Sequence, residues 1–196
     1  MPAKTVLLYF GSFNPIHQGH LIIAEHAVDY SGISELWFVV TPRNPLKKKS
    51  TLAPDYDRLH LVHLAIEDNP RFRACDIEFY LPKPSYTIDT LAHLEEKYPN
   101  HHFSLLMGSD NVHTLPKWKN YEVLLSRYPL YIYPRPGYAL QQLPPLGDYH
   151  ILPEAPMLHI SASLIRKKLS LGLSIRYLVH PAVYDYISSS QMYKTR

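Results

Sequence analysis

Short, almost entirely apolar segments alternate along this chain with longer segments whose apolar residues recur at helical spacing. The first apolar segment spans residues 5–10, and the next segment, at about 19–30, places Leu21, Ala24 and Val28 on one helical face. Strands that are apolar on both faces are typical of parallel sheets covered by helices on both sides, with right-handed crossovers. The sequence therefore predicts an α/β fold built on a doubly wound parallel sheet.

The same alternation continues to the C-terminus. Further strands are expected at residues 35–40, 72–79, 102–107, 130–133 and 149–152. Further helices are expected at about 54–69, 87–98 and 120–128, then from about Ser163 and around 182–187. In the second helix we expect Leu59, Val62 and Ile66 to form the buried stripe. A chain of 196 residues fits one domain, 1–196, whose part from about 155 to 196 is helical.

Composition excludes several classes of protein. Apolar residues make up 46% of the chain, which suffices for a hydrophobic core, yet the longest apolar runs have only the length of a strand. The first residues lead directly into a predicted strand, without the pattern of a signal peptide. The single cysteine, Cys75, excludes an internal disulfide and fits a reducing compartment. We therefore expect a cytoplasmic protein that does not span a membrane.

The basic residues are few but clustered. The net charge of +3 is too small to predict nucleic-acid binding. Arg43 precedes a run of three lysines, Lys47 to Lys49, and a second run begins at Arg166. Two short basic runs suit a phosphorylated small molecule, although solvated loop lysines are the simpler explanation.

The segment that follows the first predicted strand carries the clearest chemical signal. Gly11 is expected to let the backbone come close to a ligand where the strand stops. His17 and His20 lie at the start of the next predicted helix, where free backbone N–H groups and the helix dipole favour anions. The pair therefore predicts a phosphate site, and the alternative is a pair of capping or core histidines.

Residues 11–20 also resemble the H-x-G-H signature of the nucleotidyltransferase superfamily. Several later segments are similar, in order, to motifs of the nicotinate/nicotinamide mononucleotide adenylyltransferases. These segments cover residues 84–91, 108–110, 115–118, 135–138, 160–166 and 174–179. The chain departs from the family pattern in places that include Leu46, Ser109, Ala162, Ser163 and His180. These departures weaken the inference about which pyridine nucleotide is preferred.

The resemblance implies a role for each matching residue. Those implied in catalysis are His17, His20 and Arg166. Those implied in ATP binding are Gly11, Ser12, Phe13, His20, Gly108, Asp110, Ile160, Ser163 and Arg166. Those implied in mononucleotide binding are Asn14, Lys47, Lys48, Tyr86, Thr87, Thr90, Lys117 and Trp118.

Physical arguments support some of these roles and leave simpler explanations open for others. Ser163 and Arg166 are expected in the first turn of a helix, where they can converge on the ATP phosphates. Ser163 could instead be a helix N-cap, and Asp110 could be an N-cap rather than a partner of the ribose hydroxyls. Trp118 offers a flat surface for a pyridine ring, but an isolated tryptophan more often belongs to the core.

The expected reaction is adenylyl transfer from ATP to nicotinate mononucleotide, giving deamido-NAD and pyrophosphate. Mg²⁺ is the expected cofactor, held mainly by ATP phosphates and water, with no protein metal ligand. The alternatives are nicotinamide mononucleotide as the acceptor and a non-catalytic nucleotide sensor of the same fold. A zinc site is disfavoured because three pairs of histidines lack compact cysteine or carboxylate partners. These pairs are His17 and His20, His60 and His63, and His101 and His102. Association into a homo-oligomer stays open.

Overall fold

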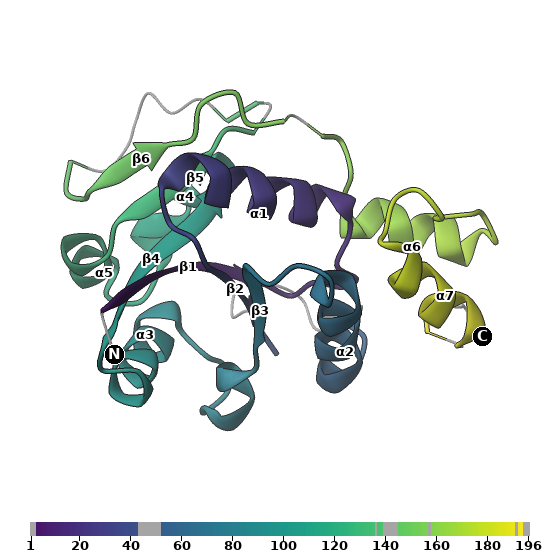
Figure 1. The fold of residues 1–196 in the computed structure, drawn as a ribbon, viewed down its shortest axis with the longest axis horizontal. Helices are drawn as coiled ribbons and strands as arrows, with labels where there is room; N and C mark the ends of the chain where they lie inside the picture. Colours follow the sequence, from purple (N-terminus) through teal and green to yellow (C-terminus); the bar gives the residue numbers. More distant parts are fainter. Residues whose placement is uncertain are drawn as a thin grey trace.

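The computed structural model describes residues 3–42, 52–135, 137–138, 145–156, 158–190 and 192–193. Its strands form one sheet in the order β3-β2-β1-β4-β5-β6, with every neighbouring pair parallel (Figure 1). The strands are β1 (Lys4–Gly11), β2 (Leu36–Val40), β3 (Phe72–Cys75), β4 (His101–Gly108), β5 (Leu130–Tyr133) and β6 (Tyr149–Ile151). The predicted parallel α/β sheet is confirmed.

Helices cover both faces of this sheet. The longer helices are α1 (Gln18–Ser31), α2 (Asp55–Ile66), α3 (Thr87–Lys97), α5 (Tyr121–Arg127), α6 (Ala162–Ser170) and α7 (Pro181–Ser189). The short ones are η2 (Ile77–Tyr80), α4 (Ser109–Val112) and η3 (Leu115–Lys117), none of which was among the helices expected from the sequence. None of the helices in the described ranges has the length and apolar character needed to cross a membrane.

The central strand β1 separates two hydrophobic cores. Val6, Leu7 and Leu8 are fully buried and alternate in direction. Leu7 belongs to the core that contains residues of α1, α2, α6 and α7, whereas Leu8 belongs to the core that contains residues of α3 and α5. Because β1 pairs with both β2 and β4, its carboxyl end lies where the strand order changes direction. Ligands of open α/β sheets bind at such a point.

The expected strand at 72–79 is wrong in its second half. β3 ends at Cys75, and Asp76 adopts φ −103° and ψ 12°, which turns the backbone out of the extended conformation. The chain continues as η2, which places the side chain of Glu78 inside the protein. Long-range partners of Glu78, described below, therefore outweigh the local strand preference of this apolar run.

The buried stripe of α2 also differs from the expectation. Leu59 is only partly buried, and the buried positions are Arg58, Leu61, Val62, Ala65 and Ile66. This set has regular helical spacing, and its first member is an arginine. Val62 and Ile66 are buried as expected, whereas Arg58 and not Leu59 is buried in the first turn, because a search for apolar residues alone passes over an arginine.

We expect Leu8→Ala to lower the free energy of unfolding by about 2–5 kcal/mol, because Leu8 is fully buried and the substitution leaves a cavity. Urea unfolding monitored by circular dichroism measures the change. Val123→Ala on α5 is the control, since Val123 is 46% exposed. An equal effect of the two substitutions would contradict this packing.

Candidate functional site

A cavity of about 350 Å³ opens at the carboxyl ends of β1 and β5. Its walls come from β1, the start of α1, the segment after β5 and the segment before α6. They are formed by Tyr9, His17, Gly19, His20, Ile23, Tyr133, Pro134, Arg135, Tyr138, Pro156, Leu158, His159, Ile160 and Ser161. The cavity therefore brings together residues from both ends of the chain.

His17 and His20 form one wall of the cavity. Their rings stack at a centroid distance of 3.6 Å, and the backbone N–H of His17 donates to Nδ1 of His20 at 3.2 Å. A neutral His20 that accepts at Nδ1 carries its proton on Nε2, so that nitrogen is a hydrogen-bond donor. The expected position of both histidines at the start of α1 is confirmed, with His17 as the N-cap residue.

His17 is neutral near pH 7. Burial and the neighbouring positive charge of Arg135 lower the pKa of His17 from 6.5 to about 4. Its Nδ1 is buried and has no hydrogen-bond partner in the described part of the protein. An anionic group entering the cavity would relieve both effects, because it would accept a hydrogen bond and favour the protonated imidazole.

Arg135 lines the cavity opposite these histidines, although the sequence analysis assigned it no individual role. Its Nη2 donates to the Tyr133 hydroxyl at 2.7 Å, and its Nε lies 3.3 Å from Oδ1 of Asp110. A Cβ at Gly108 would overlap Asp110 and come within 2.8 Å of the Arg135 Nε. Gly108 is therefore required for this ion pair. The sequence signal for Arg135 was its place in the motif at 135–138.

Asp110 is not a helix N-cap. Gly108 occupies the N-cap position of α4, and Asp110 lies inside the first turn of this short helix. Its carboxylate pairs with Arg135, which lines the cavity, whereas Asp110 itself is not part of the cavity wall. The N-cap alternative for Asp110 is therefore wrong.

The end of β1 is closely packed between Gly11, its last residue, and aromatic side chains. A Cβ at Gly11 would come within 2.7 Å of the Phe13 ring, so this side chain requires a glycine here. The approach of Gly11 to a ligand stays a prediction. Phe13 is buried, and its ring contacts those of Tyr9, His20 and Phe38 edge-on. Phe13 therefore supports the His20 ring through this edge-on contact. The neighbouring residue Ser12 is half-buried.

Arg166 reaches the same loop from α6. Its Nη1 donates to the backbone carbonyl of Asn14 at 2.7 Å, and its Nη2 donates to the Ser163 hydroxyl at 3.2 Å. The Asn14 side-chain oxygen accepts from Tyr193 O–H at 2.7 Å and from Ala53 N–H at 3.1 Å. Asn14 is therefore a junction between the C-terminal region and the loop after β1.

The start of α6 differs from the expectation. Ser161 is the N-cap, and its hydroxyl accepts from the backbone N–H of Leu164. The N-cap alternative for Ser163 is therefore wrong. Ser163 lies in the first turn, but Arg166 lies one turn further along because the helix begins earlier than expected. Ser161 is part of the cavity wall, whereas Ser163 and Arg166 are not.

Two of the residues implied in pyridine binding lie at the start of α3. Tyr86 is its N-cap residue and Thr87 its first helical residue. The ammonium of Lys119 lies 4.9 Å from the centroid of the Tyr86 ring and donates to Asp89 at 2.7 Å. Lys119 thus connects α3 with the segment of η3 that carries the exposed Lys117 and the half-buried Trp118. The Trp118 indole N–H donates to the Thr114 hydroxyl at 3.1 Å.

Thr90, which was also implied in mononucleotide binding, lies in the interior of the protein. It is fully buried, and its hydroxyl bonds the carboxylate of Glu78 at 2.9 Å. Glu78 also accepts from the Ser85 hydroxyl at 2.9 Å. Burial raises the pKa of Glu78, and the hydrogen bonds from these hydroxyls oppose that rise. Glu78 was missed because the apolar run around it predicted a strand. Lys47 and Lys48 lie outside the described residues.

Comparisons with known proteins agree on one family. Residues 8–168 match the family described as cytidylyltransferase-like. A "probable nicotinate-nucleotide adenylyltransferase" of Flavobacterium johnsoniae is 50% identical and covers 95% of this chain and 97% of its own length. A Bacteroides fragilis protein of the same name is 47% identical over 92% of this chain and 89% of its own length.

A solved structure shares the fold. The nicotinic acid mononucleotide adenylyltransferase of Plasmodium falciparum, complexed with NaAD, superposes with a TM-score of 0.77. It is 23% identical, and the superposition covers 97% of each chain. At this identity the likeness concerns the arrangement of strands and helices.

The low pKa of His17 predicts a pH-dependent stability. The unfolded chain binds a proton at His17 below pH 6.5, whereas the folded chain does so only near pH 4. His17 therefore lowers the free energy of unfolding progressively as the pH falls through this window. Between about pH 7 and pH 5 we expect the wild-type protein to lose about 2 kcal/mol more than His17→Gln.

Urea unfolding at the two pH values measures this difference. His63→Gln on α2 is the control, because His63 is exposed and should lose stability with pH as the wild-type protein does. Equal losses in the wild-type protein and in His17→Gln would show that His17 is not desolvated.

Proposed function

Since this chain belongs to the cytidylyltransferase-like family and, within it, to the nicotinate-nucleotide adenylyltransferases, we propose that it transfers the adenylyl group of ATP to nicotinate mononucleotide. The products are deamido-NAD and pyrophosphate, a step of NAD biosynthesis. The observation that carries this proposal is the cavity at the carboxyl ends of β1 and β5, with His17 and His20 on one wall. The use of ATP as a substrate and the presence of a single cysteine are both consistent with a location in the cytoplasm.

The mononucleotide phosphate is the nucleophile in this reaction. Its oxygen forms a bond to the α-phosphorus of ATP, and the bond from that phosphorus to the bridging oxygen breaks, so pyrophosphate leaves with the electron pair. A phosphomonoester is mostly dianionic near neutral pH, because its second pKa is about 6. The reaction therefore requires no general base from the protein, which instead positions the two substrates and stabilises charge.

His17 and His20 bind the α- and β-phosphates in this proposal. The Nε2–H of His20 is the donor that its Nδ1 contact selects. The Nδ1 of His17, which has no partner among the described residues, supports a second donor toward the same anion. Donors that are already oriented cost no reorganisation when negative charge develops on the transferred phosphoryl group.

Arg166 and Ser163 hold the leaving pyrophosphate in this proposal. Arg166 is fixed by the Asn14 carbonyl, which keeps its guanidinium beside the loop that follows β1. Arg135 lines the cavity after β5, and its partner Asp110, after β4, accepts hydrogen bonds from the ribose hydroxyls of ATP in this proposal. Ile160 contributes an apolar part of the cavity wall.

The acceptor lies on the other side of the loop after β1. Asn14, Thr87 and the rings of Tyr86 and Trp118 receive the mononucleotide, with Lys117 at the rim. Lys47 and Lys48 are assigned to its phosphate from the sequence alone. Mg²⁺ enters with ATP and offsets the phosphate charge, held by phosphates and water. No group of three His, Cys, Asp or Glu side chains in the described ranges could hold a metal by itself.

We expect His20→Ala to reduce kcat by about 10²–10³-fold while the protein stays folded, because it removes one oriented donor to the transferred group. Pyrophosphate release and far-UV circular dichroism measure the two quantities. His63→Ala, on the exposed surface of α2, should retain wild-type turnover. Near-full activity of His20→Ala would refute the assigned role.

The choice of acceptor is tested by pyrophosphate release from ATP and Mg²⁺ with nicotinate or nicotinamide mononucleotide in parallel. We expect a strong preference for the nicotinate form. Equal use, or a preference for nicotinamide, would keep the reaction and overturn the substrate assignment. ATP binding without release from either acceptor would favour a nucleotide sensor.

A further inference from the structure

Arg58 is a buried cation that no role assigned above explains. Its side chain is fully buried at the first position of the apolar stripe of α2. The guanidinium donates to backbone carbonyls from three separate segments and to one carboxylate. These acceptors are Ser12 O at 2.5 Å, Thr41 O at 2.9 Å, Ala53 O at 3.0 Å, Pro42 O at 3.3 Å and Asp55 Oδ1 at 2.7 Å.

Packing alone does not account for an arginine at this position. A buried guanidinium loses its hydration, and well-packed apolar residues are often equally stabilising in its place. What an apolar residue cannot do is bind several carbonyl oxygens at fixed directions, as the planar guanidinium does. The contacts of Arg58 join the loop after β1 to the end of β2 and to the segment before α2. In sequence, Pro42 and Ala53 flank the segment that carries Lys47 and Lys48.

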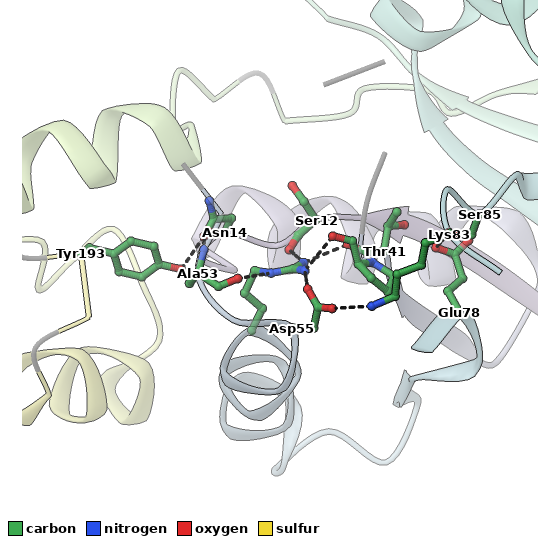
Figure 2. A network of polar contacts seen from close by, with 11 residues as sticks. Ser12, Asn14, Thr41, Ala53, Asp55, Glu78, Lys83, Ser85 and Tyr193 are labelled. Carbon is green, nitrogen blue, oxygen red and sulfur yellow. Dashed lines mark hydrogen bonds and ion pairs between the residues drawn. The ribbon is translucent and has the colours of Figure 1, made fainter. Parts of the chain in front are cut away.

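A first connection leads from Arg58 to the start of α3. The Thr41 carbonyl accepts a hydrogen bond from Arg58, and a hydrogen bond from the Thr41 side chain lowers the pKa of the Glu78 carboxyl. Glu78 in turn accepts from the hydroxyls of Ser85 and Thr90, which flank Tyr86 and Thr87 in sequence. Ser12, Thr41, Glu78 and Ser85 can be followed across Figure 2.

A second connection runs along the surface to the same segment. Asp55 binds Arg58 through Oδ1 and the Lys83 ammonium through Oδ2 at 3.0 Å. Lys83 lies two residues before Ser85 in sequence. Two connections therefore link one guanidinium to the segment that leads into α3, and the one through Asp55 and Lys83 is drawn in Figure 2.

We infer that Arg58, acting through Thr41 and Glu78, is a positioning residue that sets the pyridine-facing segment around Tyr86 and Thr87 against the loop that carries Asn14. The inference rests on the proposed function, since that assigns Asn14, Tyr86 and Thr87 to the mononucleotide. Arg58 itself is buried and touches no reacting atom. Its effect falls on the binding of the mononucleotide more than on the binding of ATP, because the cavity beside His17 and His20 has walls from other segments.

The sharpest test is Thr41→Val, which keeps the backbone carbonyl for Arg58 and removes the hydroxyl that bonds Glu78. We expect the KM for nicotinate mononucleotide to rise about tenfold, since small displacements in an acceptor site have effects of this order or more. The KM for ATP should stay within about twofold of the wild-type value. Thr5→Val is the matched control, because Thr5 is exposed at the opposite end of β1.

Arg58→Lys tests the arginine itself. A lysine keeps the charge but cannot serve acceptors spread over three guanidinium nitrogens, so we expect the same selective rise in KM. Adding Thr41→Val to Arg58→Lys should raise that KM by less than the product of the single effects, because both act on one chain of contacts. Arg71→Lys is the control, since Arg71 pairs only with Glu25 and Asp29 among the described carboxylates.

Hydrogen exchange provides a readout that does not depend on turnover. Thr41→Val should speed amide exchange in residues 85–91 and leave α5 unchanged. Unchanged exchange, or a KM for the mononucleotide that stays within about twofold in Thr41→Val, would overturn the inference. A wild-type protein without pyrophosphate release would refute the proposed function instead, and exchange would still decide whether Thr41 orders this segment.

Discussion

The pairing of β1 with both β2 and β4 is the constraint on which the rest of the structure depends. It buries β1 on both faces and places its carboxyl end where the strand order changes direction. The loop after β1 therefore meets the end of β2 on one side and the ends of β4 and β5 on the other. Two binding regions can form at one edge of the sheet because a single loop borders both.

The net charge around the cavity depends on the burial of its ionisable side chains as well as on their identity. Arg135 and Arg166 are permanent cations, whereas His17 is held neutral by desolvation and by the charge of Arg135. Asp110 compensates part of the charge of Arg135. The free site is thus less positive than its basic residues suggest.

The sequence predicted the sheet, the two histidines and most helices, because these depend on local periodicity and on contiguous motifs. It did not predict the end of β3, because Glu78 turns inward toward Ser85 and Thr90, which follow later in the chain. Arg58 was missed because the pattern of α2 was read from apolar residues alone, although the spacing of Arg58 with Leu61 and Val62 is visible in the sequence. The contact of Arg135 with Asp110 requires the three-dimensional arrangement. The roles of individual site residues stay predictions.

The contacts of Asn14 also constrain when the protein can become active during its synthesis. Arg166 binds the Asn14 carbonyl across 152 residues, and Tyr193 binds its side chain across 179. The loop after β1 receives these two partners only when residues 166 and 193 have been made. Residues of α6 and α7 also belong to the core that contains Leu7 of β1, so one face of the sheet is completed at the same late stage of synthesis.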